Sequence, residues 1–258
     1  MTGLRRRTVI MLLAWAAGGS LYANVIGLPQ AQFRHVYPLG ANGRVVIQNL
    51  YGDVRITAWD RDEVVVEAFK RSPDPRLLED AHIVVEPSDG SLSIHTQYGG
   101  ADANRPASVE YRITVPRRTT LEDVKLINGG LSISGVAGLV KASSVNGNIK
   151  VERLGGEAEL STVNGQLEAD FAQTSRANPI RLSSVNGPIK LSLPCGTEAS
   201  LYARNLSGGI ESDVGTVRRA SGGHRLVVRR GGPAIHLDNI NGGISIHSFS
   251  RRRVQPDT

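Results

Sequence analysis

The stretch from Ser143 to Asp170, SSVNGNIKVERLGGEAELSTVNGQLEAD, nearly repeats itself. Val-Asn-Gly occupies 145–147 and returns at 163–165, and each copy is followed by an apolar-charged-apolar triplet, Ile149-Lys150-Val151 and then Leu167-Glu168-Ala169. Alternation with a period of two is typical of β-strands, and Asn-Gly is typical of tight turns. The stretch therefore predicts a repeating unit made of two strands and a turn.

The same unit recurs along the C-terminal half. Each turn residue is preceded by apolar residues at two positions, four and one residues before it. It is followed by apolar residues three and five residues after it, with one exception at the latter position. The turn residues are Asn128, Asn146, Asn164, Asn186, Ser207 and Asn241. Most intervals between them are about 18–22 residues, and the last is longer because of an insertion at 214–232. A fixed period of this length indicates a repeat architecture.

Two all-β architectures produce this pattern. A meander of hairpins follows from the turn chemistry, because both central residues of Asn-Gly tolerate positive φ. A parallel β-solenoid also explains why one residue type recurs, since stacked asparagines can hydrogen-bond their own copies. The column four residues after the turn reads Ser132, Lys150, Glu168, Lys190, Glu211, Ser245, so that charges alternate as in-register stacking requires. We therefore favour a solenoid of about 18–22-residue coils with a ladder of Asn128, Asn146, Asn164, Asn186 and Asn241.

The N-terminal half carries a fainter form of the pattern. Turn signals occur at Tyr51-Gly52 and Asp89-Gly90, flanked by alternating apolar residues, and a short helix is expected at 76–81. We expect an irregular, partly antiparallel β cap. The predicted organisation is a signal peptide at 1–23, a linker at 24–35, the cap at 36–118, the repeats at 119–248 and a disordered basic tail at 249–258.

The first 23 residues resemble an export signal. Three arginines at 5–7 precede a short apolar run and small residues that end at Ala23. The alternative is a retained N-terminal anchor, and Arg6-Arg7 leaves Sec and twin-arginine export both open. Without this segment the chain has 27 basic and 24 acidic residues, and three of the basic ones are Arg251–Arg253. The nearly neutral body predicts no nucleic-acid binding, and we expect the protein in the periplasm or at the cell surface, not spanning the membrane after cleavage.

The order of motifs resembles a known bacterial family. Leu50–Asp60, Val64–Ala68 and Tyr111–Pro116, followed by the Asn-Gly repeats through Gly242, are similar to the β-strand-repeat family called “putative adhesin”, related to the heads of autotransporter-type adhesins. The resemblance covers about residues 36–248. It implies an exported β-solenoid domain and carries over no active-site residues.

Candidate chemical sites in the sequence are sparse. The outward acids Glu152, Asp170 and Asp213 are expected about 10 Å apart, which is too far for paired acid-base catalysis. His236 and Asp238, with His247 beyond them, form only a weak metal-binding pattern. The lone Cys195 is expected to be buried and inert. We therefore predict no catalytic residue, metal ligand or cofactor.

These observations favour a non-enzymatic module that binds a protein or polysaccharide of the cell envelope. Two alternatives stay open. A carbohydrate-binding or carbohydrate-active protein would use Trp59 and the insertion, through Arg218, Arg229 and Arg230. An envelope-stress sensor would instead have a membrane-protein partner.

Overall fold

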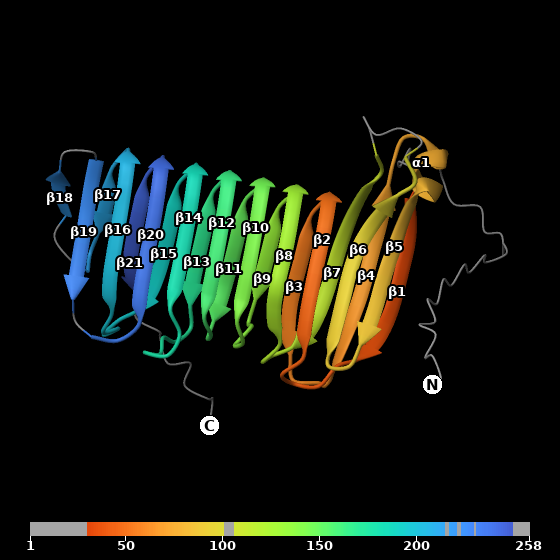
Figure 1. Ribbon diagram of the computed structural model, residues 1–258, viewed down its shortest axis with the longest axis horizontal. Coiled ribbons are helices and arrows are strands. Elements are labelled where there is room, and N and C mark those ends of the chain that lie inside the picture. The colour runs from red at the N-terminus through yellow and green to blue at the C-terminus, as the bar shows by residue number, and fades with distance from the viewer. Residues whose placement is uncertain (1–29, 101–105, 215–216, 221–222, 230, 250–258) are drawn as a thin grey trace, which may run out of the picture.

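The computed structural model describes residues 30–100, 106–214, 217–220, 223–229 and 231–249. Two large, open β-sheets lie face to face and form an elongated array, with one continuous apolar core between them (Figure 1). Both sheets contain parallel and antiparallel pairs. Among the described residues, no helix is long and apolar enough to cross a membrane.

Ten strands form the first sheet, called sheet A. In spatial order they are β1 (Gln30–Pro38), β4 (Glu63–Arg71), β7 (Ser108–Pro116), β3 (Val54–Trp59), β9 (Leu131–Ser134), β11 (Ile149–Leu154), β13 (Leu167–Phe171), β15 (Ile189–Pro194), β21 (Ile244–Phe249) and β17 (Ile210–Ser212).

Eleven strands form the second sheet, called sheet B. Their spatial order is β18 (Val217–Ala220), β19 (Gly223–Arg229), β16 (Ser200–Ser207), β20 (Ala234–Asn241), β14 (Ile180–Asn186), β12 (Ala158–Asn164), β10 (Val140–Asn146), β8 (Thr120–Asn128), β2 (Arg44–Tyr51), β6 (Ser91–Tyr98) and β5 (Ala81–Ser88).

Each Asn-Gly turn of the repeat joins a strand of sheet B to a strand of sheet A. Asn146 ends β10 in sheet B, and β11 begins at Ile149 in sheet A. Neighbouring units pair in parallel and in register, so that Asn146 lies beside Asn164 and Lys150 beside Glu168. The meander of hairpins is therefore wrong for the repeat.

The units are not stacked in the order of the sequence. Strands β20 and β21, the last in the chain, lie between the β14/β15 unit and the β16/β17 unit. Ser245 consequently separates Lys190 from Glu211, and the expected alternation of charges fails at that end. The insertion at 214–232 contains β18 and β19, which extend sheet B: β19 pairs antiparallel with β16, and β18 pairs antiparallel with β19.

The N-terminal region is built in a similar way. Strands β6 and β7 lie beside the β2/β3 unit. Outside them, β5 pairs antiparallel with β6, β4 pairs antiparallel with β7, and β1 pairs antiparallel with β4. Helix α1 (Pro75–Asp80) confirms the expected helix to within a residue, and Asp74 accepts the N–H of Arg76 at its start. Asp89-Gly90 is a hairpin turn, not the start of another repeat unit.

Two domain boundaries differ from those expected. Strand β1 begins at Gln30, so the predicted linker at 24–35 is wrong over its last six residues. The core continues without a break past 118, because β2 of the cap pairs with β8 of the repeats. The predicted signal peptide and residues 250–258 of the tail lie outside the described residues.

Three of the four apolar columns face the core. Leu160, Leu167 and Ala169 are buried, as are their apolar counterparts in the other units. The fourth column, one position before the turn, is expected from its apolar character to face inward but is exposed: Val163 is 40% exposed. The reason is the period of two, since residues three apart on one strand cannot share a face.

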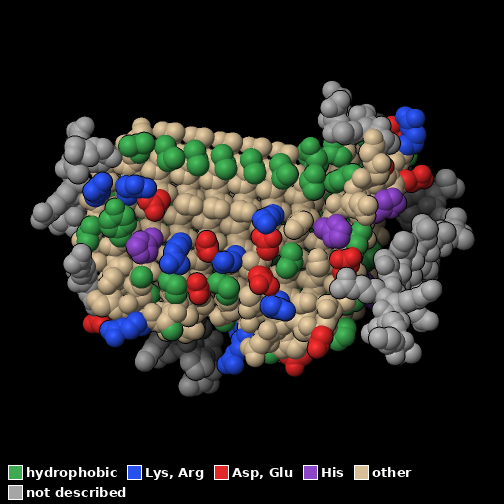
Figure 2. Space-filling model, in the orientation of Figure 1, with side chains coloured by type: hydrophobic (Ala, Val, Ile, Leu, Met, Phe, Trp, Pro, Cys, Tyr) green, Lys and Arg blue, Asp and Glu red, His purple; other side chains and the backbone are tan. Residues whose placement is uncertain are grey.

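The misassigned column forms a row that we call the aliphatic ridge. It crosses seven adjacent strands of sheet B and appears as a green row along the face in Figure 2. Its members are Leu50, Ile127, Val145, Val163, Val185, Ile240 and Leu206.

Two substitutions on β12 test this assignment of faces. Leu160→Ala should lower the free energy of unfolding by about 2–5 kcal/mol, because it leaves a cavity in the core. Val163→Ala should change it by less than about 1 kcal/mol, because the side chain already meets solvent. Urea unfolding of both variants measures the difference, and equal losses would contradict the assignment.

Candidate functional site

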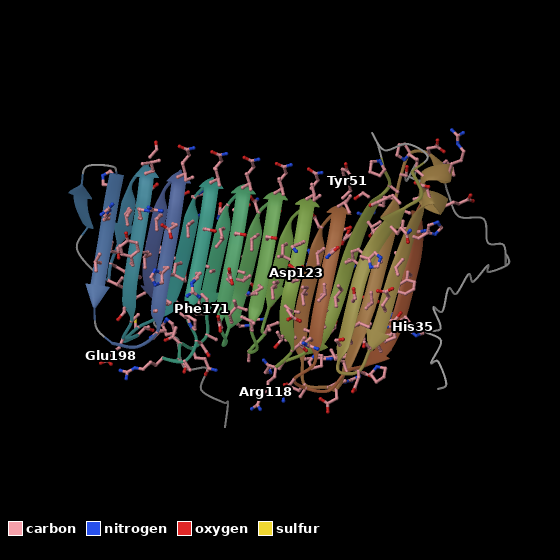
Figure 3. The ribbon with its side chains drawn as sticks, viewed as in Figure 1. His35, Tyr51, Arg118, Asp123, Phe171 and Glu198 are labelled. Atoms are coloured by element: carbon pink, nitrogen blue, oxygen red, sulfur yellow. The ribbon has the colours of Figure 1, made fainter. Side chains whose placement is uncertain are left out.

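The Asn-Gly edge of the array carries a ladder of side-chain hydrogen bonds. The Nδ2 of each asparagine donates to the Oδ1 of its neighbour at 2.9 Å, from Asn241 through Asn186, Asn164 and Asn146 to Asn128. Ser207 takes the next place on β16, and Tyr51 takes the place on β2. In Figure 3 these side chains stand in a row along one edge, beginning next to the labelled Tyr51.

A second polar column lies inside this edge, and sequence reasoning missed it. Ser144, Thr162 and Ser184 are buried two positions before the turn and donate to glycine carbonyl oxygens, at 3.1 Å for Thr162 and Gly147. Asn49, Asn205 and Asn239 do the same elsewhere in the column. The signal was a polar residue at a position that the period of two assigns to the core.

Glycine is required at these turns by close packing. A Cβ at Gly147 would overlap the carbonyl oxygen of Gly129 in the neighbouring unit. At the C-terminal end, Gly208 has φ of 125°, which side chains rarely adopt. The turns are therefore packed structural joints, and their buried polar groups serve the backbone.

The outward acids of sheet A are engaged in local contacts. Glu152 and Asp170 lie on the adjacent strands β11 and β13, so the expected 10 Å separation is wrong for this pair. Lys150 Nζ lies 2.7 Å from Glu152 Oε1 and, by its hydrogen bond and charge, holds the pKa of Glu152 below its ordinary value. A general acid needs the opposite shift. Asp170 accepts the N–H of Arg153, and Asp213 accepts the N–H of Ser248.

A shallow depression of about 390 Å³ lies on sheet A where β3, β9 and β11 adjoin. It forms because Gly130 and Ser132 are smaller than the flanking residues Arg55, Asn148 and Lys150. We call it the polar depression.

The polar groups of the depression differ in how firmly they are held. Asp53 accepts the N–H of Gly130 at 2.7 Å, and Asn148 accepts that of Gln166 at 2.8 Å. Burial alone would raise the pKa of Glu110, but hydrogen bonds and charge from Arg112 and Arg71 keep it below its ordinary value. Arg55 makes no ion pair with a described residue. The depression therefore offers fixed carboxylates and two cationic side chains.

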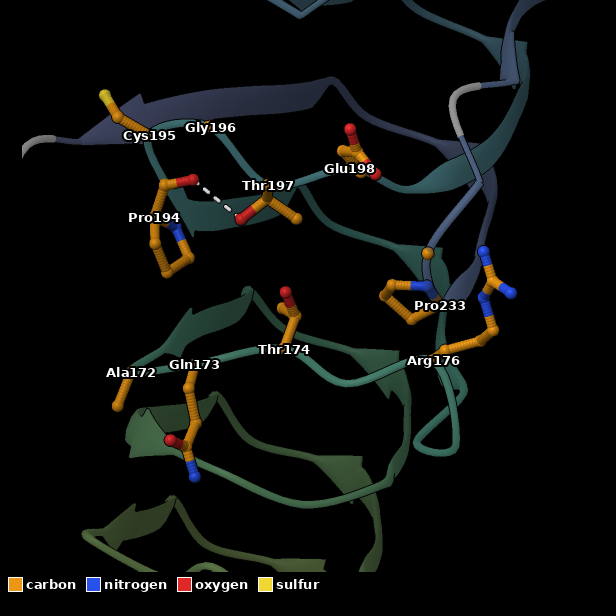
Figure 4. Close-up of a pocket in the computed structure, with 11 residues that line it drawn as sticks. Ala172, Gln173, Thr174, Arg176, Pro194, Cys195, Gly196, Thr197, Glu198 and Pro233 are labelled. Atoms are coloured by element: carbon orange, nitrogen blue, oxygen red, sulfur yellow. Dashed lines mark hydrogen bonds between the residues drawn. The ribbon is translucent and has the colours of Figure 1, made fainter.

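A second hollow, of about 480 Å³, lies among the loops after β13 and β15 (Figure 4). Thr197 donates to the carbonyl of Pro194 at 2.7 Å, and Arg176 and Glu198 form no ion pair with each other there. Cys195 is exposed, contrary to expectation, because it lies in this loop and not in a strand. In Figure 4 its sulfur points away from Thr174 and Arg176. Among the described residues that line the hollow, the side chains of Cys195, Arg176 and Glu198 form no hydrogen bond or ion pair with one another.

The predicted contact residues do not form one site. Trp59 lies at the end of β3 and donates to the carbonyl of Glu63 at 2.9 Å, while Arg61 lies over its ring. Arg218 and Arg229 are in β18 and β19, at the far end of sheet B, and Arg230 lies outside the described residues. The structure thus separates the aromatic side chain from the arginines.

The weak metal pattern is also divided. His236 and Asp238 are in sheet B, where Asp238 pairs with Arg204 at 3.0 Å, whereas His247 is in sheet A. Within the described part of the chain, no three His, Cys, Asp or Glu side chains are placed to hold a metal ion.

Comparison with known proteins identifies the fold. No family model and no curated protein matches the sequence. A crystal structure from Clostridium sporogenes, described as a “putative cell adhesion protein”, is 12% identical with a TM-score of 0.50, covering 85% of this chain and 100% of that chain. A “putative adhesin” from Bacteroides fragilis is 12% identical with a TM-score of 0.42, covering 85% and 97%. At such identity, the first likeness establishes a shared fold alone.

The Asn ladder makes a pH-dependent prediction. In Asn164→Asp the carboxylate can still accept from Asn186, but it faces the Oδ1 of Asn146 and has no proton to donate. We expect a loss of about 1 kcal/mol of unfolding free energy at pH 7. The new carboxyl should have a raised pKa in the folded state. The hydrogen bond to Asn146 is then restored below about pH 4, near the pKa of the carboxyl in the unfolded chain. It is lost as the pH rises through the higher pKa of the carboxyl in the folded chain.

The matched control is Asn164→Ala, which removes the rung and adds no titrating group. Its deficit relative to the wild type should be the same at pH 3 and pH 7. Thermal unfolding at both pH values measures the two deficits. A pH-independent deficit for Asn164→Asp would contradict the assignment of Asn164 as donor to Asn146 and acceptor from Asn186.

Proposed function

We propose that the protein is an exported, non-enzymatic β-solenoid that serves as an interaction module at the bacterial cell envelope. The observation that carries this proposal is the outer face of sheet A. It is a regular polar surface that continues across β3, β9, β11, β13 and β15, and its described acids are committed to local partners.

The ladder and the glycine packing support a rigid platform rather than a site that closes around a substrate. Side chains that project from strands stacked in register keep a fixed spacing, because each is held by neighbours on both sides. Such a surface suits an extended ligand that makes many similar contacts. The parallel solenoid, the division into an N-terminal cap and the Asn-Gly repeats that share one core, and export of the chain belong to this proposal.

The polar depression favours a polysaccharide as the ligand class. Arg55 and Lys150 flank a floor formed by Gly130 and Ser132, which leaves space for a ring carrying hydroxyl or carboxylate groups. Lys150 is cationic at neutral pH, as lysine ordinarily is, and the hydrogen bond and charge of Glu152 raise its pKa further. An envelope protein with an extended acidic segment is the alternative ligand.

Binding to isolated envelope material tests the proposal. The full chain should co-sediment with purified peptidoglycan sacculi or with cell-surface polysaccharide from the producing bacterium. Arg55→Glu with Lys150→Glu should weaken retention at least fivefold, because it reverses both cations of the depression. The matched control, Arg118→Glu with Arg176→Glu, makes the same change of charge in exposed loops that belong neither to the depression nor to sheet B, and should bind like the wild type.

Two results would contradict the proposal. One is equal binding by both double variants, which would remove the depression from the interaction. The other is release of soluble sugar from these polymers by the wild type but not by Asp170→Asn, which would make the protein an enzyme.

A further inference from the structure

The outer face of sheet B differs in chemistry from that of sheet A. The aliphatic ridge crosses it without interruption, and Ile127, Val145, Val163 and Ile240 are each between 40% and 45% exposed. A row of seven exposed or partly exposed branched side chains is an uncommon surface for a monomeric protein, since large contiguous apolar patches mark interaction sites.

A row of charges runs parallel to the ridge, four residues back along each strand. It reads Asp123 on β8, Lys141 on β10, Glu159 on β12 and Arg181 on β14. Asp123 also pairs with Lys125, two residues nearer the ridge on β8, with Nζ and Oδ2 2.7 Å apart. Figure 2 shows the alternating red and blue side chains below the green row. Lys141 and Glu159 are register partners, with Nζ and Oε2 3.3 Å apart, and Glu159 is the register partner of Arg181.

This row has a particular symmetry. Read from β8 to β14 its signs are minus, plus, minus, plus, and read backwards each sign is reversed. A two-fold axis parallel to the strands, midway between β10 and β12, reverses the order of strands in a second copy while keeping the position along each strand. Under that operation Lys141 faces Glu159 of the second copy, and Asp123 faces Arg181 of the second copy.

The same axis lays ridge on ridge. Val145 of one copy meets Val163 of the other, and Ile127 meets Val185, because the ridge residues occupy equivalent positions on their strands. A two-fold interface requires this kind of self-complementarity, since one patch must match itself. In-register pairing within the sheet already produces the alternation of charges. Because the row has an even number of members, the same alternation also matches a second copy across the two-fold axis.

The face is also large enough. The axis pairs six ridge strands, β2, β8, β10, β12, β14 and β20, with one another. Strands about 4.8 Å apart and about seven residues long then give a surface of roughly 29 by 23 Å. That is about 670 Å² per copy, within the range of roughly 600–1,000 Å² per partner of a standard stable interface. Sheets that pack face to face lie about 10 Å apart, a distance that long charged side chains can span from both sides.

We propose that two copies of this chain associate through the outer faces of sheet B, about a two-fold axis between β10 and β12. The aliphatic ridge supplies the buried apolar area, and the charge row sets the register and excludes shifted arrangements. Both sheet A faces remain outward, on opposite sides of the dimer. This inference does not depend on the ligand proposed for sheet A.

Two charge variants with the same net charge test the geometry. Asp123→Lys with Lys141→Glu changes the row to plus, minus, minus, plus, so that like charges face each other across the axis. Lys141→Glu with Glu159→Lys gives minus, minus, plus, plus, in which every pair across the axis is still opposite. We expect the first variant to raise the dimer dissociation constant at least tenfold and the second to stay within about threefold of the wild type.

A third variant removes the apolar contact. Val145→Lys with Val163→Lys places four lysines at the centre of the proposed interface, on positions that are exposed in the single chain, and should give a folded monomer. Sedimentation velocity of the purified full-length chain measures association, and circular dichroism establishes that each variant is folded. No envelope polymer is present, so the outcome is separate from that of the sacculus experiment.

Three results would overturn the proposal: a monomeric wild type at about 100 µM, equal dissociation constants for the two charge variants, or a folded ridge variant that still forms the dimer.

Discussion

Parallel pairing in register is the constraint on which the rest of the structure depends, because each residue then lies beside its counterpart in the next unit. An amide can satisfy its own copy, which explains the Asn ladder. A charged side chain repels its own copy, which explains why Lys141 lies beside Glu159 and Lys150 beside Glu168. Close approach of the turns excludes side chains, which explains Gly147. One geometric rule thus selects the residue type at each column.

The sequence predicts the structure well where a column contains one residue type. It misleads where the apolar character of a residue conflicts with the period-two alternation of its strand. The repeated Asn146 and Asn164 predict the register correctly. The apolar character of Val163 predicts a buried side chain, but the alternation that begins at the buried Leu160 places Val163 on the opposite, exposed face. The position of β20 could not be predicted, since its offsets match those of every other unit and any two units can pair. Trp59 is separated from Arg218 and Arg229 because β3 lies in sheet A beside the N-terminal strands, whereas β18 and β19 extend the opposite end of sheet B.

The two faces of the array divide the chemistry between them. Sheet A presents alternating charges, hydroxyls and the polar depression, and its acids are bound to neighbouring groups instead of converging. Sheet B presents the aliphatic ridge beside a charge row. The two hollows described above lie at the surface, one on sheet A and one among its loops. Specificity in such a molecule comes from the spacing of side chains more than from an enclosed cavity.

The late insertion of β20 and β21 between earlier strands affects how the molecule can be made. A chain synthesised from its N-terminus can stack β8 to β15 as they emerge, but β16 has no permanent parallel neighbour until Ala234–Asn241 has arrived. Completion therefore waits for the last strands, and contacts that are distant in sequence form slowly. A polypeptide that ends before residue 234 would lack an internal unit of the array. It would expose unpaired edges of β14 and β16 in sheet B and of β15 and β17 in sheet A to proteases and to aggregation.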